Sequence, residues 1–176
     1  AAITPWNYPL PNLAHKVGPA LAAGNVVVLK PSEIASRSAC EVARLAAESG
    51  LPDGLLQVVP GRGANVGEAL ARHADVDLLT FTGSTAVGQR IQQLAGASNG
   101  KRLMLELGGK SPQIVAPDAV EAIETILPAL VGAALANSGQ LCVAKSRLLV
   151  PSTALARVEA LLESELARHA PGDPRD

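Results

Sequence analysis

Residues 78–96, LLTFTGSTAVGQRIQQLAG, combine a short apolar run, a turn that contains glycine, and a helical pattern. Leu78 to Phe81 has the length and apolar character of a buried strand, and Val87, Ile91 and Leu94 follow at the spacing of one helix face. A strand that passes through a tight turn directly into a helix is the repeating unit of an α/β fold.

The same alternation continues on both sides of this stretch. Strands are predicted at residues 25–30, 55–59 and 103–107, and helices at 36–49 and 66–73. Ser36 or Ser38 would cap the first of these helices, and Gly50 would end it. The fold class predicted is therefore α/β, with a doubly wound parallel (Rossmann-like) sheet and right-handed crossovers.

The pattern changes after Gly108 and Gly109. Strands are expected at 113–115 and 147–150, a long apolar helix at 120–136, and an amphipathic helix at 152–169. We therefore predict a partial domain over residues 1–107 and the beginning of a second α/β domain over residues 108–176.

Composition excludes several classes of protein. Of 176 residues, 48% are hydrophobic and 18% charged, which excludes a disordered chain. Aromatic residues make up only 2%, so the core must be aliphatic. A net charge of -1 argues against a nucleic-acid partner. Two cysteines cannot build a disulfide framework, which favours a reducing compartment and a cytoplasmic location.

The longest uncharged stretch, residues 125–144, has a continuous apolar part of only 126–136, interrupted by Pro128. A membrane span needs roughly 20 mostly apolar residues. We therefore expect a buried helix here and no membrane association. The chain lacks an initial Met and a signal-peptide pattern, and it is expected to be a piece of a longer protein.

Two places could bind the phosphates and ribose of a nucleotide. Thr82, Gly83 and Ser84 lie between a strand and a helix, where backbone N–H groups favour an anion; the alternative is an ordinary turn with Ser84 as helix cap. Lys30 and Glu33 follow a strand at the edge where α/β sheets bind ligands, but both could equally be solvated residues. The glycines of residues 61–67 do not have the G-x-G-x-x-G spacing, and residues 83–90 do not form a Walker A loop.

Two residues are candidates for covalent and acid–base chemistry. Cys142 follows a polar break that contains Gly139, and it is either an exposed nucleophile or a buried thiol. Glu106 interrupts an apolar strand, so it is either a general base in apolar surroundings or a strand-end carboxylate in solvent. Cys40 lies among Ala and Val and is expected to be buried. The histidines are expected at the surface, and no metal site is predicted.

Five segments then converge on one family. In chain order they are PWNYPL (5–10), LKPSE (29–33), FTGST (81–85), LELGGKSP (105–112) and NSGQLC (137–142). Together they closely resemble the NAD(P)-dependent aldehyde dehydrogenase superfamily, from the first residue to the last. The match looks like the middle of a family member, so residues 1–107 would be a partial NAD-binding domain and 108–176 a partial catalytic domain.

The resemblance implies a catalytic role for three residues. Cys142 matches the nucleophile that forms a thiohemiacetal with the aldehyde and then, after hydride transfer to the nicotinamide, a thioester. Asn7 matches the amide that joins the Cys142 backbone N–H in stabilising the oxyanion. Glu106 matches the general base that activates water to release a carboxylic acid.

The resemblance also implies a cofactor site, with NAD preferred over NADP because Glu33 would repel a 2′-phosphate. Its cofactor-binding residues would be Thr4, Pro5, Trp6, Asn7, Lys30, Ser32, Glu33, Gly63, Gly67, Phe81, Thr82, Gly83, Ser84, Val87, Glu106, Leu107 and Gly108. Ala86 departs from the acidic residue common in the family pattern. The expected partners are a small aldehyde and, for the full-length form, further copies of the protein.

The same residues allow two other functions. A non-catalytic nucleotide-binding module would bind NAD without turnover, and the isolated chain would be inactive if truncated. A cysteine-dependent esterase would use Cys142 and Glu106 without a nicotinamide.

Overall fold

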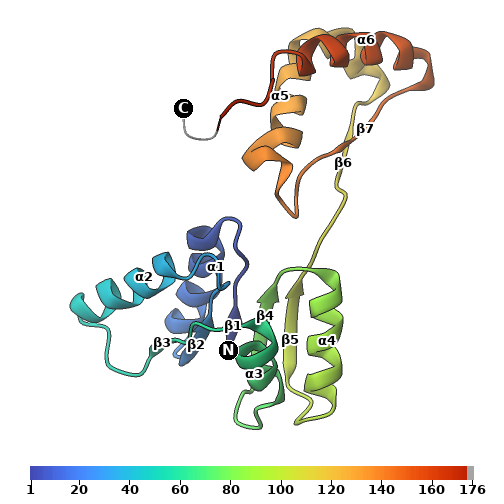
Figure 1. Cartoon of the computed structure of the whole chain (residues 1–176). Helices are drawn as coiled ribbons and strands as arrows, with labels where there is room; N and C mark the ends of the chain where they lie inside the picture. The colour runs from blue at the N-terminus through green and yellow to red at the C-terminus, as the bar shows by residue number, and fades with distance from the viewer. Residues whose placement is uncertain (174–176) are drawn as a thin grey trace. The chain divides into compact units, whose positions relative to one another are not determined.

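A computed structural model describes residues 1–173 of the chain, which divide into two compact units, Ala1–Gly108 and the described residues from Gly109 onward. Figure 1 shows the first unit in blue to green and the second in yellow to red. The division lies beside the boundary predicted between residues 107 and 108. We describe each unit separately.

The first unit contains a five-stranded sheet in the order β3-β2-β1-β4-β5, and every neighbouring pair is parallel. This confirms the predicted parallel α/β fold. Its strands are β1 (Ala2–Ile3), β2 (Val27–Lys30), β3 (Leu56–Val58), β4 (Leu78–Thr82) and β5 (Arg102–Glu106). The short strand β1, at the very start of the chain, lies at the centre of the sheet.

Helices cover both faces of this sheet (Figure 1). They are α1 (Pro9–Ala22), α2 (Arg37–Glu48), the π-helical turn η1 (Gly63–Gly67), α3 (Glu68–Arg72) and α4 (Thr85–Gly96). Leu13 and Val17 of α1 pack with Leu29 on one face, together with α2. Ile91 of α4 and Ala71 of α3 join the cluster on the opposite face. The sheet is thus doubly wound.

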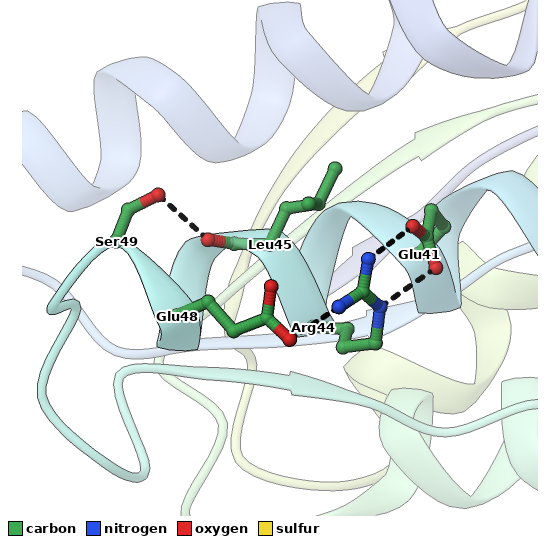
Figure 2. Close-up of polar contacts among 5 residues, drawn as sticks. All are labelled: Glu41, Arg44, Leu45, Glu48 and Ser49. Carbon is green, nitrogen blue, oxygen red and sulfur yellow. Dashed lines mark hydrogen bonds and ion pairs between the residues drawn. The ribbon is translucent and has the colours of Figure 1, made fainter.

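The outer face of α2 carries a small ion-pair network, shown in Figure 2. The Arg44 guanidinium donates to Glu41, with Nε–Oε2 at 3.0 Å, and also to Glu48. These carboxylates raise the pKa of Arg44 above its ordinary value. Ser49 closes the helix by donating from Oγ to the Leu45 carbonyl at 2.7 Å. Because all these charges are exposed, the pairs add little stability.

The prediction that Cys40 is buried is wrong. Cys40 is an exposed free thiol on α2, whereas Ala39, the preceding residue, is 3% exposed. Successive residues of an α-helix are about 100° apart around its axis, so Ala39 takes the inward position and turns Cys40 outward. All three histidines are exposed, as predicted.

The second unit contains a parallel pair of strands, β6 (Pro112–Ile114) and β7 (Arg147–Leu149). Its helical segments are η2 (Pro117–Ala122), α5 (Ile123–Leu135), η3 (Ala136–Gly139), η4 (Ser152–Ala154) and α6 (Leu155–Leu166). Ile123 of α5 and Val158 of α6 are both buried, and together with Val115 they form the core of this unit.

The apolar helix of the second unit is less buried than predicted. In α5 only Ile123, Leu127 and Val131 are buried, and these three lie at the spacing of one helix face. The remaining face is largely exposed because only one side packs on the core of this unit. Within residues 1–173, Pro117–Gly139 has the length and apolar composition of a membrane span, a property that core helices of other proteins share.

Candidate active site

The carboxyl ends of four strands meet at one edge of the sheet. Ile3 is in register with both Lys30 and Phe81, and Thr82 is in register with Glu106. The edge therefore collects the predicted residues that follow β1, β2, β4 and β5. In the strand order β3-β2-β1-β4-β5 the direction of winding reverses between β1 and β4, which is where open α/β sheets bind their ligands.

Lys30 is held at this edge by burial and by two hydrogen bonds. Its side chain is 3% exposed, and Nζ donates to the Pro31 carbonyl at 3.0 Å and to Glu33 Oε2 at 3.3 Å. The nearby backbone N–H groups of Glu33 itself and of Gly63 also favour its ionised form. The hydrogen bond to its own N–H, then Lys30, and finally Gly63 hold the pKa of Glu33 below its ordinary value. The structure thus brings together three residues of the predicted cofactor site.

The turn between β4 and α4 has the geometry of a phosphate-binding turn. Ser84 is the N-cap of α4, and its Oγ accepts from Val87 N at 3.4 Å. A Cβ atom on Gly83 would lie 2.4 Å from the Phe81 ring, and one on Gly88 would lie 2.5 Å from the Leu107 side chain. A side chain at position 83 would have to displace the buried Phe81 ring, and one at position 88 the Leu107 side chain. Glycine therefore keeps side chains away from the N-terminus of α4, where an anion would bind.

Asn7 lies in the turn between β1 and α1. It is half-buried, and Asn12 Nδ2 donates to the Asn7 carbonyl at 3.2 Å and to the Tyr8 carbonyl at 3.1 Å. Tyr8, at the start of α1, has a left-handed backbone with φ 51°. Thr4 is buried and donates its N–H to the Lys30 carbonyl at 3.1 Å. The side chain of Trp6 is exposed.

Glu106 does not lie in apolar surroundings in this chain. It is exposed at the end of β5, an edge strand whose Met104 is also exposed on the same face. The solvent-facing alternative therefore describes Glu106 here. The backbone carbonyl oxygen of Glu106 nevertheless accepts from Gly83 N at 3.1 Å. This hydrogen bond connects the end of β5 to the turn between β4 and α4.

Lys16, which sequence reasoning missed, lies on the same side of the sheet. Its Nζ donates to Thr80 Oγ1 at 2.8 Å. Burial lowers the pKa of Lys16, and attraction to the negative charge of Glu106 opposes this shift. No local sequence pattern indicates Lys16. Its partner Thr80 and the charge of Glu106 are distant in the sequence and come near Lys16 only when the sheet has formed.

Cys142 lies in the second unit, and the structure shows it as an exposed free thiol. The buried alternative is therefore wrong. The loop that precedes it contains three consecutive left-handed residues: Asn137 with φ 52°, Ser138 with φ 57° and Gly139 with φ 72°. Only the glycine was predicted to be unusual. Such conformations are costly for Asn and Ser and concentrate at functional sites.

The remaining predicted residues are distributed along the edge of the first unit. The ends of β1, β2 and β5 are followed by Pro5, Ser32, Leu107 and Gly108, and Gly67 is the last residue of η1. Gly67 is buried, and a Cβ atom there would lie 3.9 Å from Ile3. The buried ammonium of Lys30, the turn at Gly83 and the N-terminus of α4 capped by Ser84 fit the adenosine and pyrophosphate parts of a dinucleotide.

Comparison with known proteins identifies the family to which a chain with this fold belongs. The family model described as the aldehyde dehydrogenase family matches residues 1–176. The NADP/NAD-dependent aldehyde dehydrogenase PuuC of Escherichia coli (strain K12) is 47% identical over 176 residues, which are 100% of this chain and 35% of that protein. The chain therefore belongs to the aldehyde dehydrogenase family.

Solved structures agree with this assignment. The aldehyde dehydrogenase KauB from Pseudomonas aeruginosa matches with a TM-score of 0.89 and 48% identity, over 99% of this chain and 35% of that one. An indole-3-acetaldehyde dehydrogenase in complex with NAD+ matches with a TM-score of 0.89 and 47% identity, again over 99% and 35%. The chain thus spans about a third of the length of these relatives.

Proposed function

We propose that this chain carries the cofactor site and the nucleophile of an enzyme that oxidises an aldehyde to a carboxylic acid with NAD+. The observation that carries the proposal is Cys142, an exposed thiol on a left-handed loop in a member of the aldehyde dehydrogenase family. A thiol presented in this way can reach a carbonyl carbon, whereas a buried cysteine cannot.

The proposed reaction assigns one step to each of three residues. The Cys142 thiol gives its proton to water, the thiolate sulfur bonds to the aldehyde carbon, and the carbonyl oxygen becomes an oxyanion that would accept from the Asn7 amide and the Cys142 N–H. Each such donor contributes about 3 kcal/mol to stabilising the transition state. NAD+, when bound, accepts the hydride from this carbon. Glu106 then takes a proton from water, whose oxygen attacks the thioester carbon, and the carboxylic acid leaves as the Cys142 sulfur is released.

The first unit would hold the cofactor. Lys30, Glu33 and Gly63 form a polar cluster suited to the adenosine ribose, and Gly83 with Ser84 would bind the pyrophosphate. Glu33 supports NAD+ over NADP+, because its carboxylate can accept from a ribose hydroxyl and repels a phosphate in that position. The carboxyl ends of β1 and β4 would direct the nicotinamide.

We also propose a cytoplasmic location and a homo-oligomeric full-length form. Both cysteines are free thiols, which supports a reducing compartment. Exposed apolar side chains such as Ile34 (77%) and Ile114 (75%) support further protein contacts. We further propose that the protein acts on a soluble small-molecule aldehyde and that neither a membrane nor a nucleic acid is its partner. Cell fractionation and size-exclusion chromatography of the full-length protein test these points.

The deciding experiment measures NADH formation from several aldehydes and NAD+, comparing the unmodified chain with Cys142→Ser and with Cys40→Ser as a matched control. Turnover should be lost in Cys142→Ser and retained in Cys40→Ser. Turnover that survives in Cys142→Ser contradicts the proposal. NAD+ binding without turnover by the unmodified chain favours a nucleotide-binding module, and ester cleavage that needs neither NAD+ nor Glu33 favours an esterase.

A further inference from the structure

Gly109 approaches the backbone of Cys142 so closely that no other residue fits there. A Cβ atom at position 109 would lie 2.9 Å from the Cys142 carbonyl oxygen. We propose that Gly109 is a positioning residue. Because it has no side chain, the backbone of Cys142 can lie directly against it, and this contact fixes the position of the Cys142 loop. The inference rests on the proposed function, because it concerns the nucleophile that function requires.

The Cys142 side of this contact is a constrained loop. Gln140 N donates to the Asn137 carbonyl at 3.0 Å, and Asn137 Nδ2 donates to the Gln140 carbonyl at 3.4 Å. Beyond Cys142, Ala144 N donates to the Leu141 carbonyl at 3.1 Å. Turns on both sides of Cys142 therefore limit how far its carbonyl group can rotate away from position 109.

The Gly109 side is held as well. Arg147 Nε on β7 donates to the carbonyl of Lys110, the next residue, at 2.7 Å. Gln113 Nε2 donates to the Leu130 carbonyl at 2.8 Å and to the Lys145 carbonyl at 2.9 Å, which ties β6 to α5 and to the segment after Cys142. The chain on this side thus cannot slide away without breaking these bonds.

A methyl group at position 109 must consequently displace the Cys142 carbonyl. The opposing atom belongs to the backbone, so no side-chain rotation relieves the contact. The turns on both sides of Cys142 restrict rotation about its Cα–C bond, so the displaced carbonyl carries the Cα atom and the attached Cβ–Sγ group with it. Displacing a reacting group by about 1 Å can cost 100-fold in rate.

The test is acylation of Cys142 by p-nitrophenyl acetate, followed by peptide mass spectrometry in the full chain. Gly109→Ala should lower the acylation rate ~10- to 100-fold at saturating ester. The affinity for NAD+ and the alkylation of Cys40 by iodoacetamide, both readouts of the first unit, should remain unchanged. Gly132→Ala is the matched control, since nothing lies within 4 Å of a Cβ atom there. A general loss of folding would lower the NAD+ affinity together with the acylation of Cys142, whereas displacement of the Cys142 loop lowers the acylation alone.

Wild-type acylation of Cys142 in Gly109→Ala overturns the inference, as does an equal loss in Gly132→Ala. If Gly109→Ala does not fold, Arg147→Met decides: it removes every donor to the Lys110 carbonyl while keeping an unbranched side chain, and Arg147 is exposed. Its Cys142 acylation should fall by a smaller factor, about 3-fold, and an unchanged rate again overturns the inference. Failure of the proposed function is seen separately, as aldehyde turnover that survives in Cys142→Ser.

Discussion

Lys30 and Glu33 form an ion pair at the carboxyl edge of the sheet, with Nζ and Oε2 3.3 Å apart. The pair is asymmetric, because the Lys30 side chain is 3% exposed and the Glu33 side chain 52% exposed. Lys30 therefore acts as a buried anchor that orients a carboxylate still accessible to a ligand. The backbone N–H of Gly63, in the loop that follows β3, also favours the ionised form of Glu33.

The first prediction concerns the choice between NAD+ and NADP+. Glu33→Gln keeps the shape of the side chain but removes its charge, so it should weaken NAD+ binding and relieve repulsion of a 2′-phosphate. Hydrogen bonds to charged groups contribute about 1.5–3 kcal/mol, so the ratio of the two Kd values should shift by about 10-fold or more toward NADP+. Calorimetric titration with both nucleotides measures it. Glu159→Gln, an exposed site in the second unit, is the control, and an unchanged ratio in Glu33→Gln would contradict the assigned role.

The second prediction concerns acid stability. The pKa of Glu33 is lowered in the folded state, so its ionised form stabilises the fold at pH values above its ordinary pKa of 4.5. This contribution is lost as pH falls through the lowered folded value. Urea unfolding should show wild type more stable than Glu33→Gln at neutral pH, and the two should converge in acid. A difference independent of pH would mean that charge is not the cause.

Several strands could be predicted because their physical signal is local. The aliphatic runs of β2 and β4 are long enough to predict strands. Ser84 is a typical N-cap residue, so it predicts the start of α4. The contact between Glu33 and Gly63 could not be predicted in the same way. It depends on the parallel register of β2 and β3, which no local pattern encodes.

One wrong prediction and two features that the sequence left open also have physical causes. Cys40 and Ala39 differ by one helical step, and apolar character alone does not tell which of the two faces inward. Glu106 is exposed because β5 is an edge strand with one open face, which follows from strand order rather than from residue type. The left-handed backbone of Asn137 and Ser138 arises from the path of the loop, since neither residue requires it.

The third prediction tests the helix cap beside the phosphate turn. Ser84→Ala removes the acceptor for Val87 N and should lower the free energy of unfolding by about 1 kcal/mol. NAD+ affinity should fall in parallel, because Ser84 belongs to the proposed pyrophosphate site. Ser36→Ala is a matched control: Ser36 is the N-cap of α2 but makes no side-chain cap hydrogen bond. Equal losses in the two variants, measured by urea unfolding, would show that the Ser84 cap has no special role.

The fourth prediction concerns Lys101, which is 7% exposed at the start of β5. Its Nζ donates to the Ala71 carbonyl at 2.7 Å, so the ammonium caps the C-terminal end of α3, where carbonyl groups lack helical partners. Lys101→Met should lower the free energy of unfolding by about 1–3 kcal/mol, because the carbonyl stays buried without this donor. Lys145→Met, at an exposed site, should change it by less than about 0.5 kcal/mol.

The sign of the pH dependence at Lys101 provides an independent check. Burial lowers the pKa of Lys101, so between the folded value and the ordinary value of 10.5 the unfolded chain binds more protons than the folded one. The stability of wild type relative to Lys101→Met should therefore rise as pH increases through this window. Urea unfolding from neutral pH to about pH 10 measures the slope, and a slope of the opposite sign would mean that the ammonium is stabilised rather than desolvated by its surroundings.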